Sequence, residues 1–139
     1  MDRHSARRVV LELLYEREFS PEAGESVLQG KHFGDQAGFV RERFAGVVQH
    51  LEALDAMLAP RTRGWRYERI SLVDRNILRL GAYELLFAGD LPAEAALDEA
   101  VELCKAYGTE RCSGFVNGIL DRLWKERGGE LDSPPPATG

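Results

Sequence analysis

Apolar residues recur at intervals of three and four along most of this 139-residue chain. In the first such segment, Ala6, Val9, Val10, Leu13 and Leu14 fall on one side of a helix. An α-helix completes a turn every 3.6 residues, so this spacing gathers apolar side chains on one face, whereas a half-buried strand needs strict alternation. No segment of four or more residues alternates convincingly, and the sequence therefore predicts an all-α fold.

Capping residues, glycines and prolines divide the chain into five principal helices and one or two short ones. Ser71 with Asp74 resembles a capping box, and Thr109 is predicted to cap the last helix. The principal helices are expected over residues 5–19, 35–59, 71–87, 93–107 and 109–127, and a short one begins at residues 20–22. None can bury its apolar face alone, so they must share a bundle-like core.

The length fits one domain, which we expect to span residues 1–127. The remaining residues, 128–139, are rich in glycine and proline and are expected to be a disordered tail. No apolar run approaches the roughly 20 residues of a membrane-spanning helix. The N-terminal "MDRHSARRVV" lacks the apolar core of a signal peptide. These features predict a cytoplasmic protein.

The usual signs of catalysis and metal binding are absent from the sequence. Cys104 and Cys112 fall on apolar helical faces and are predicted to be buried free thiols rather than a disulfide or a ligand pair. The three histidines are far apart in the chain and have no carboxylate or cysteine at metal spacing. No G-x-S-x-G, P-loop or H-E-x-x-H motif occurs. We therefore expect no metal, no cofactor and no enzyme activity.

Charge is distributed unevenly, although the net charge is −5. Residues 61–79 contain six arginines and two acids, a local balance of +4. Residues 80–104 contain six acids and neither lysine nor arginine. One surface could therefore attract an anion such as a nucleic acid while another attracts a basic protein.

Three arginines, Arg3, Arg7 and Arg8, lie in the first turns of the first predicted helix. Cations at a helix N-terminus oppose the helix dipole, at a cost of about 0.3–1 kcal/mol. Their presence suggests a use beyond local stability, and contact with RNA phosphates is one. Ordinary surface arginines are the alternative.

The connector "RTRGWRYER" interleaves Trp65 and Tyr67 with arginines. This composition suits a segment that stacks on bases and grips a nucleic-acid backbone. It also suits a connector whose aromatic side chains plug the core. Of the two, we favour the core plug.

The last predicted helix contains two glycines one turn apart, Gly114 and Gly118, although each costs roughly 1 kcal/mol relative to alanine in a helix. A turn of about 100° per residue places both, with Asn117 and Asp121, away from the apolar stripe. The result is a bare strip of backbone edged by polar side chains. Either a neighbouring helix packs very closely there, or a ligand does.

Two long stretches resemble the NusB family of transcription antitermination factors. They are "LVDRNILRLGAYELLF" and "LPAEAALDEAVELCKAYGTERCSGFVNGILDRL", and the N-terminal "ARRVVLELLYERE" is similar to the first helix of the family. The resemblance implies an all-α, NusB-like helical fold with about seven helices in two three-helix-bundle subdomains. It also implies that the protein binds other macromolecules and catalyses nothing.

The resemblance implies binding of the boxA element of nascent ribosomal RNA transcripts together with NusE, a small-subunit ribosomal protein, so that RNA polymerase in the elongation complex passes terminators. It assigns Glu84 to contact with NusE. A protein-only adaptor with little RNA binding, and a homodimer that masks the RNA-binding face, are the alternatives. The RNA-binding residues that it implies are Arg3, Arg7, Arg8, Tyr15, Phe115, Asn117, Gly118 and Asp121.

Overall fold

The structure is a computed structural model that describes residues 1–128, and of residues 22–25 the backbone alone. All regular elements in this range are helical, which confirms the all-α prediction. Except for Gly128, the predicted tail lies outside the described residues. The six α-helices are α1 (Arg3–Glu18), α2 (Ala37–Gln49), α3 (Leu51–Leu58), α4 (Leu72–Tyr83), α5 (Ala93–Tyr107) and α6 (Cys112–Leu123).

Short helical turns connect or extend these helices. Four are 3₁₀ turns: η1 (Pro21–Leu28), η2 (Gly34–Gln36), η3 (Ala59–Arg61) and η4 (Tyr67–Arg69). Two are π-helical: η5 (Glu84–Ala88) extends α4, and η6 (Trp124–Gly128) extends α6. The predicted short second helix is therefore present as a 3₁₀ turn.

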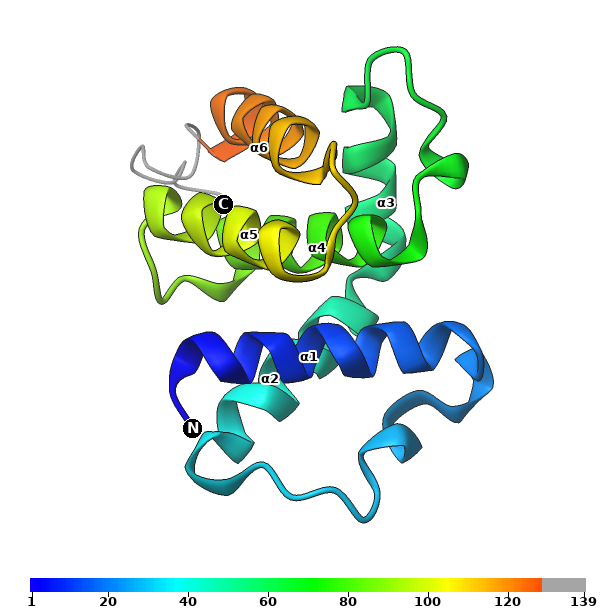
Figure 1. Cartoon of the computed structure of the whole chain (residues 1–139), viewed down its shortest axis with the longest axis vertical. Helices are drawn as coiled ribbons and strands as arrows, with labels where there is room; N and C mark the ends of the chain where they lie inside the picture. Colours follow the sequence, from blue (N-terminus) through cyan, green and yellow to red (C-terminus); the bar gives the residue numbers. More distant parts are fainter. Residues whose placement is uncertain (129–139) are drawn as a thin grey trace, which may run out of the picture.

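The helices form two halves that meet along α1 and α4 (Figure 1). One half holds α1 and α2, and the other holds α4, α5 and α6, with α3 packed beside α4. Apolar residues from both halves form one buried core. Position 46 of α2 requires a glycine, because the ring of Tyr83, on α4, occupies the space where a Cβ would lie. None of the helices within residues 1–128 is long and apolar enough to cross a membrane.

The single long helix predicted over residues 35–59 is wrong, because the chain breaks at His50 into α2 and α3. The His50 backbone has φ −101° and ψ 11°, outside the helical range. The His50 N–H donates to Gly46 O at 3.1 Å, and its Nδ1 lies 2.8 Å from the same oxygen. The break allows the chain to pass from one half to the other.

Of the two predicted helix caps, one is present in the structure and the other is not. Ser71 Oγ accepts a hydrogen bond from the Asp74 N–H at 3.1 Å, so the predicted cap of α4 is confirmed. Thr109 does not cap α6, which begins at Cys112 after Arg111. Thr109 instead donates its hydroxyl to Asp74 Oδ2 at 2.7 Å, because the turn between α5 and α6 lies against the start of α4.

The prediction of two free cysteines is also wrong. Cys104 and Cys112 are buried as expected, but the structure pairs them in a disulfide. The tight turn after α5 brings their Cα atoms to 5.4 Å, within the usual range for a disulfide. Gly108 allows this turn, because a Cβ there would lie 2.5 Å from Cys112 Sγ.

Candidate nucleic-acid and partner surfaces

Arg3 and Arg8 are exposed on the N-terminal turns of α1. The guanidinium carbon of Arg3 lies 4.2 Å from the centre of the Phe39 ring, and that of Arg8 lies 5.6 Å from the Tyr107 ring. In such a contact the flat guanidinium group lies on the face of the aromatic ring. The N–H groups along the edge of the guanidinium remain available to donate hydrogen bonds. These two arginines are therefore oriented and still able to bind phosphate.

Arg7, which is also predicted to contact phosphate, is buried rather than exposed. Its side chain is buried, with the residue 5% exposed, and its Nε lies 2.9 and 3.0 Å from the two carboxylate oxygens of Glu84. Arg7 precedes the buried residues Val10, Leu11 and Leu14 by three, four and seven positions, so it shares their inward face. This helical phase was the signal in the sequence that separated Arg7 from its neighbours.

Glu84, the residue predicted to contact a protein partner, is 3% exposed. Its carboxylate also accepts a hydrogen bond from Arg43 Nε at 3.0 Å, so two guanidinium groups enclose it. The π-helical turn η5 begins at this residue. Glu84 thus joins α1 and α2 to the other half of the molecule instead of presenting its charge to a partner.

Arg43 was missed by sequence reasoning. It is 2% exposed and donates from Nη2 to Asp90 Oδ1 at 2.6 Å, in addition to its bond with Glu84. Burial by itself lowers the pKa of Arg43, but the hydrogen bond to Asp90 and the charge of Glu84 raise this pKa above its ordinary value. Its position four residues after Phe39 and four before Val47, both buried, was the available signal.

An acidic surface remains without Glu84. The exposed acids of the acidic segment, residues 80–104, are Asp90, just before α5, and Glu94, Asp98 and Glu102 on α5. Residues four apart on a helix share a face, so the three acids of α5 form one row. This row, which we call the acidic face of α5, is the part of the predicted charge split that the fold leaves exposed.

The glycine strip of α6 is open. Among the described residues, a Cβ at Gly114 would meet no atom within 4 Å, and one at Gly118 would meet only Arg122 Nη1 at 3.5 Å. Of the two explanations for these glycines, close packing of a helix is therefore not found within residues 1–128. Asn117 is exposed, and Asp121 is half-buried and pairs with Lys125 Nζ at 2.8 Å. Between this strip and the acidic face lies a hollow of about 550 Å³.

The predicted RNA-binding residues do not form one cluster. Figure 1 shows α4 and α5 between α1, which carries Arg3, Arg8 and Tyr15, and α6, which carries the glycine strip. Tyr15 is exposed and makes an edge-to-face contact with Phe19, with the ring centres 5.2 Å apart. Phe115 is half-buried on a different side of α6 from Asn117.

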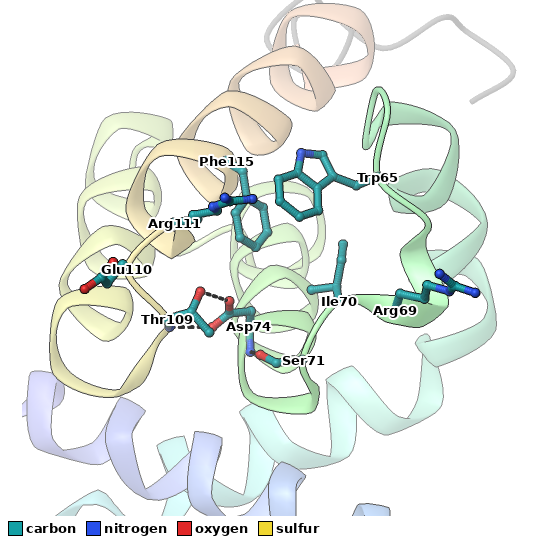
Figure 2. A pocket seen from close by; sticks show the side chains of 9 residues that line it. All are labelled: Trp65, Arg69, Ile70, Ser71, Asp74, Thr109, Glu110, Arg111 and Phe115. Atoms are coloured by element: carbon teal, nitrogen blue, oxygen red, sulfur yellow. Dashed lines mark hydrogen bonds between the residues drawn. The ribbon is translucent and has the colours of Figure 1, made fainter.

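Phe115 lies in a hollow of about 430 Å³ between the connector 61–71 and the turn from α5 to α6 (Figure 2). The ring of Trp65 is stacked on that of Phe115, with centres 5.9 Å apart and planes at 25°. Trp65 is 45% exposed, so the prediction that it plugs the core is wrong. Tyr67 points inward and donates its hydroxyl to Asp55 Oδ1 at 2.5 Å. The other lining residues are Arg69, Ile70, Ser71, Asp74, Thr109, Glu110 and Arg111.

Comparison with known proteins gives the family. The model of the NusB family matches residues 4–125. The transcription antitermination protein NusB of Pseudothermotoga lettingae is 39% identical over 127 residues, which cover 88% of this chain and 91% of that protein.

Solved structures agree with the sequence match. T. maritima NusB superimposes with a TM-score of 0.80 at 37% identity, covering 91% of this chain and 92% of that one. The crystal structure of the antitermination factors NusB and NusE in complex with dsRNA contains a chain with a TM-score of 0.74 and 26% identity, covering 89% of this chain and 96% of that one. The protein described here belongs to the NusB family.

Proposed function

We propose that this protein is a transcription antitermination factor that binds boxA-type RNA of nascent ribosomal RNA transcripts together with NusE. In this role it helps RNA polymerase pass terminators, and it acts in the cytoplasm by binding, without catalysis. The observation that carries the proposal is the likeness over 88% of the chain to an antitermination protein. A structural relative solved with NusE and dsRNA supports both partners.

On the RNA side, the exposed guanidinium groups of Arg3 and Arg8 support the proposal. Each can neutralise a phosphate, and binding of a single strand then releases the condensed counterions. Arg7 is left out of the proposed contact because it is buried against Glu84. The open strip at Gly114 and Gly118 offers a second place where RNA can approach the backbone.

On the protein side, the acidic face of α5 is the surface that we propose for NusE. A basic ribosomal protein would be attracted by the row of exposed carboxylates, which would raise the rate of association at low salt. Glu84 is not part of this surface, since Arg7 and Arg43 already occupy its carboxylate.

The test is RNA binding with and without NusE, using a boxA-like single strand, a scrambled single strand and a duplex of the same length. We expect the boxA-like strand to bind most tightly, and more tightly when NusE is present. A protein that bound NusE but retained no RNA under either condition would be a protein-only adaptor. Light scattering across a range of concentrations, with and without RNA, would show whether a homodimer competes with RNA.

A further inference from the structure

We propose that the hollow of Figure 2 is a second RNA contact and holds one nucleotide of a single strand. The base stacks on the Trp65–Phe115 pair, and Arg111 binds a neighbouring phosphate. This inference rests on the proposed function and extends it, because Trp65 and Arg111 are additional RNA-binding residues.

The aromatic pair has a free surface suited to a base. Phe115 packs partly against the core, whereas Trp65 is 45% exposed, with the Phe115 ring stacked on it and the Arg111 guanidinium over its ring. Large aromatic side chains on a protein surface commonly serve recognition, and single-stranded nucleic acids are bound by stacking bases on them. Every base has a flat face, so this contact alone does not require a particular sequence.

Trp65 is held in position without being buried. Gly64 has φ +82° and Arg63 has φ +30°, a value that a residue with a side chain rarely adopts. Thr62 is buried, and its hydroxyl oxygen lies 2.9 Å from Ala59 O and 2.8 Å from Trp65 O. The Trp65 N–H donates to Thr62 O at 3.3 Å. This closed turn presents the indole ring at the mouth of the hollow, and unfavourable backbone conformations of this kind cluster at functional sites.

The opposite wall is also fixed. Asp74 is buried, and its carboxylate accepts hydrogen bonds from the Thr109 N–H at 3.2 Å and the Thr109 hydroxyl at 2.7 Å. These bonds hold the turn that carries Arg111, whose guanidinium carbon lies 5.3 Å from the Trp65 ring centre. Asp74 is thus already satisfied by its own chain.

The charge at the rim suits a phosphate. Arg111 is exposed, and among residues 1–128 the structure gives it no ion pair, whereas the side chain of Arg69 extends away from the hollow (Figure 2). Glu110 is the one other charged residue at the rim, since Asp74 lies within the hollow. A volume of about 430 Å³ is in the range of sites for small organic ligands and accommodates a nucleotide. Bases in a duplex are stacked on each other and cannot enter, so the occupant is a single strand.

The experiment compares Trp65→Leu with Phe87→Leu in complex with NusE, using the boxA-like single strand. Phe87 is an equally exposed aromatic residue at 42%, on η5, and is the matched control. We expect Trp65→Leu to weaken RNA binding roughly tenfold, the effect of losing one stacked base. Trp65→Phe should recover most of the affinity, and Phe87→Leu should leave it unchanged.

A second measurement reports on the site directly. In a Trp124→Phe background, Trp65 is the only tryptophan of the chain, so its emission should be quenched when the single strand is added. Circular dichroism of each variant checks that the helices are retained. Substituting Arg111 by alanine should reduce the slope of log affinity against log salt by about 0.7.

The outcomes separate this inference from the proposed function. If the unmodified protein binds no RNA with NusE, the proposed function fails. If it binds RNA, while Trp65→Leu binds equally well and Trp65 emission does not change, the hollow is not an RNA site and the proposed function stands. Quenching by NusE alone, with no further change on adding RNA, would assign the hollow to a protein contact and overturn the inference.

Discussion

Two groups of arginines that look alike in the sequence have opposite surroundings in the fold. At the junction of the two halves, Arg7 and Arg43 are 5% and 2% exposed and share the carboxylate of Glu84. One residue away along α1, Arg8 is exposed, as is Arg3. Local charge density therefore does not identify a binding surface. The direction in which the helix turns each side chain decides whether its charge serves the fold or a ligand.

The largest expected effect is on the junction. Glu84→Ala would leave two buried guanidinium groups without their shared partner, and we expect a loss of about 3–5 kcal/mol in the free energy of unfolding. Urea denaturation measures this loss. Glu94→Ala, which removes an exposed acid of α5, is the control and should change stability by less than about 0.5 kcal/mol. Equal stability of the two variants would show that Glu84 is not a structural residue.

The next effect distinguishes the arginines of α1, because their substitution should change either RNA binding or stability. Arg3→Ala and Arg8→Ala should weaken RNA binding and together reduce the salt slope by about 1.4, because each removes one phosphate contact to a single strand. Arg7→Ala should mainly lower the stability of the fold. RNA titrations at several salt concentrations, paired with urea denaturation, test both statements. A reduced salt slope for a stably folded Arg7→Ala would place that residue among the RNA contacts after all.

A smaller effect concerns the glycine strip. Gly114→Ala adds a Cβ where no atom lies within 4 Å, so it should stabilise α6 by up to about 1 kcal/mol. If the open strip lets RNA approach the backbone, the same variant should lose RNA affinity while gaining stability. Thermal unfolding and RNA titration of one protein sample measure both. A gain in stability with unchanged RNA binding would remove the strip from the RNA surface.

The last effect is confined to the alkaline range, again at the junction. Burial, and then the hydrogen bond that Tyr83 donates to Glu42, raise the pKa of Tyr83 to about 12. An unfolded tyrosine ionises near pH 10, so the folded state holds this proton over a range where the unfolded state has lost it. Stability from this group is complete below pH 10 and is lost as the pH rises toward 12. Tyr83→Phe should flatten that part of the profile of unfolding free energy against pH, and phenolate absorbance of the folded protein should show the late titration directly. If Tyr83→Phe left the profile of unfolding free energy against pH unchanged, that result would count against the hydrogen bond between Tyr83 and Glu42.

Much of the fold could be predicted because helical periodicity is local. The spacing of apolar residues defined α1, α4 and α5 closely, and Ser71 predicted the start of α4. The break at His50 could not be predicted, since it depends on where the chain must pass from one half to the other. The prediction that Thr109 caps α6 is wrong for a related reason, because Thr109 bonds to Asp74, which lies 35 positions earlier in the chain.

The residue types of the candidate sites could be predicted from the sequence, but not which of those residues the fold leaves exposed. The exposed positions of Arg3 and Arg8 agree with their position outside the apolar stripe, whereas Arg7 follows the phase of the buried residues. Trp65 could not be assigned from its neighbours, because its exposure follows from the closed turn at Thr62 and from the position of Phe115, 50 residues later.

The sequence by itself determined that this protein is helical throughout its described part, that its charges are segregated, and that it resembles one family. These properties depend on residue type and on spacing within one or two helical turns, which any helix expresses wherever it packs. Only the tertiary structure decided which charges remain available. The pairing of Arg7 with Glu84 joins positions 77 residues apart, and burial in a shared core makes such a pair a structural element rather than a surface for a partner.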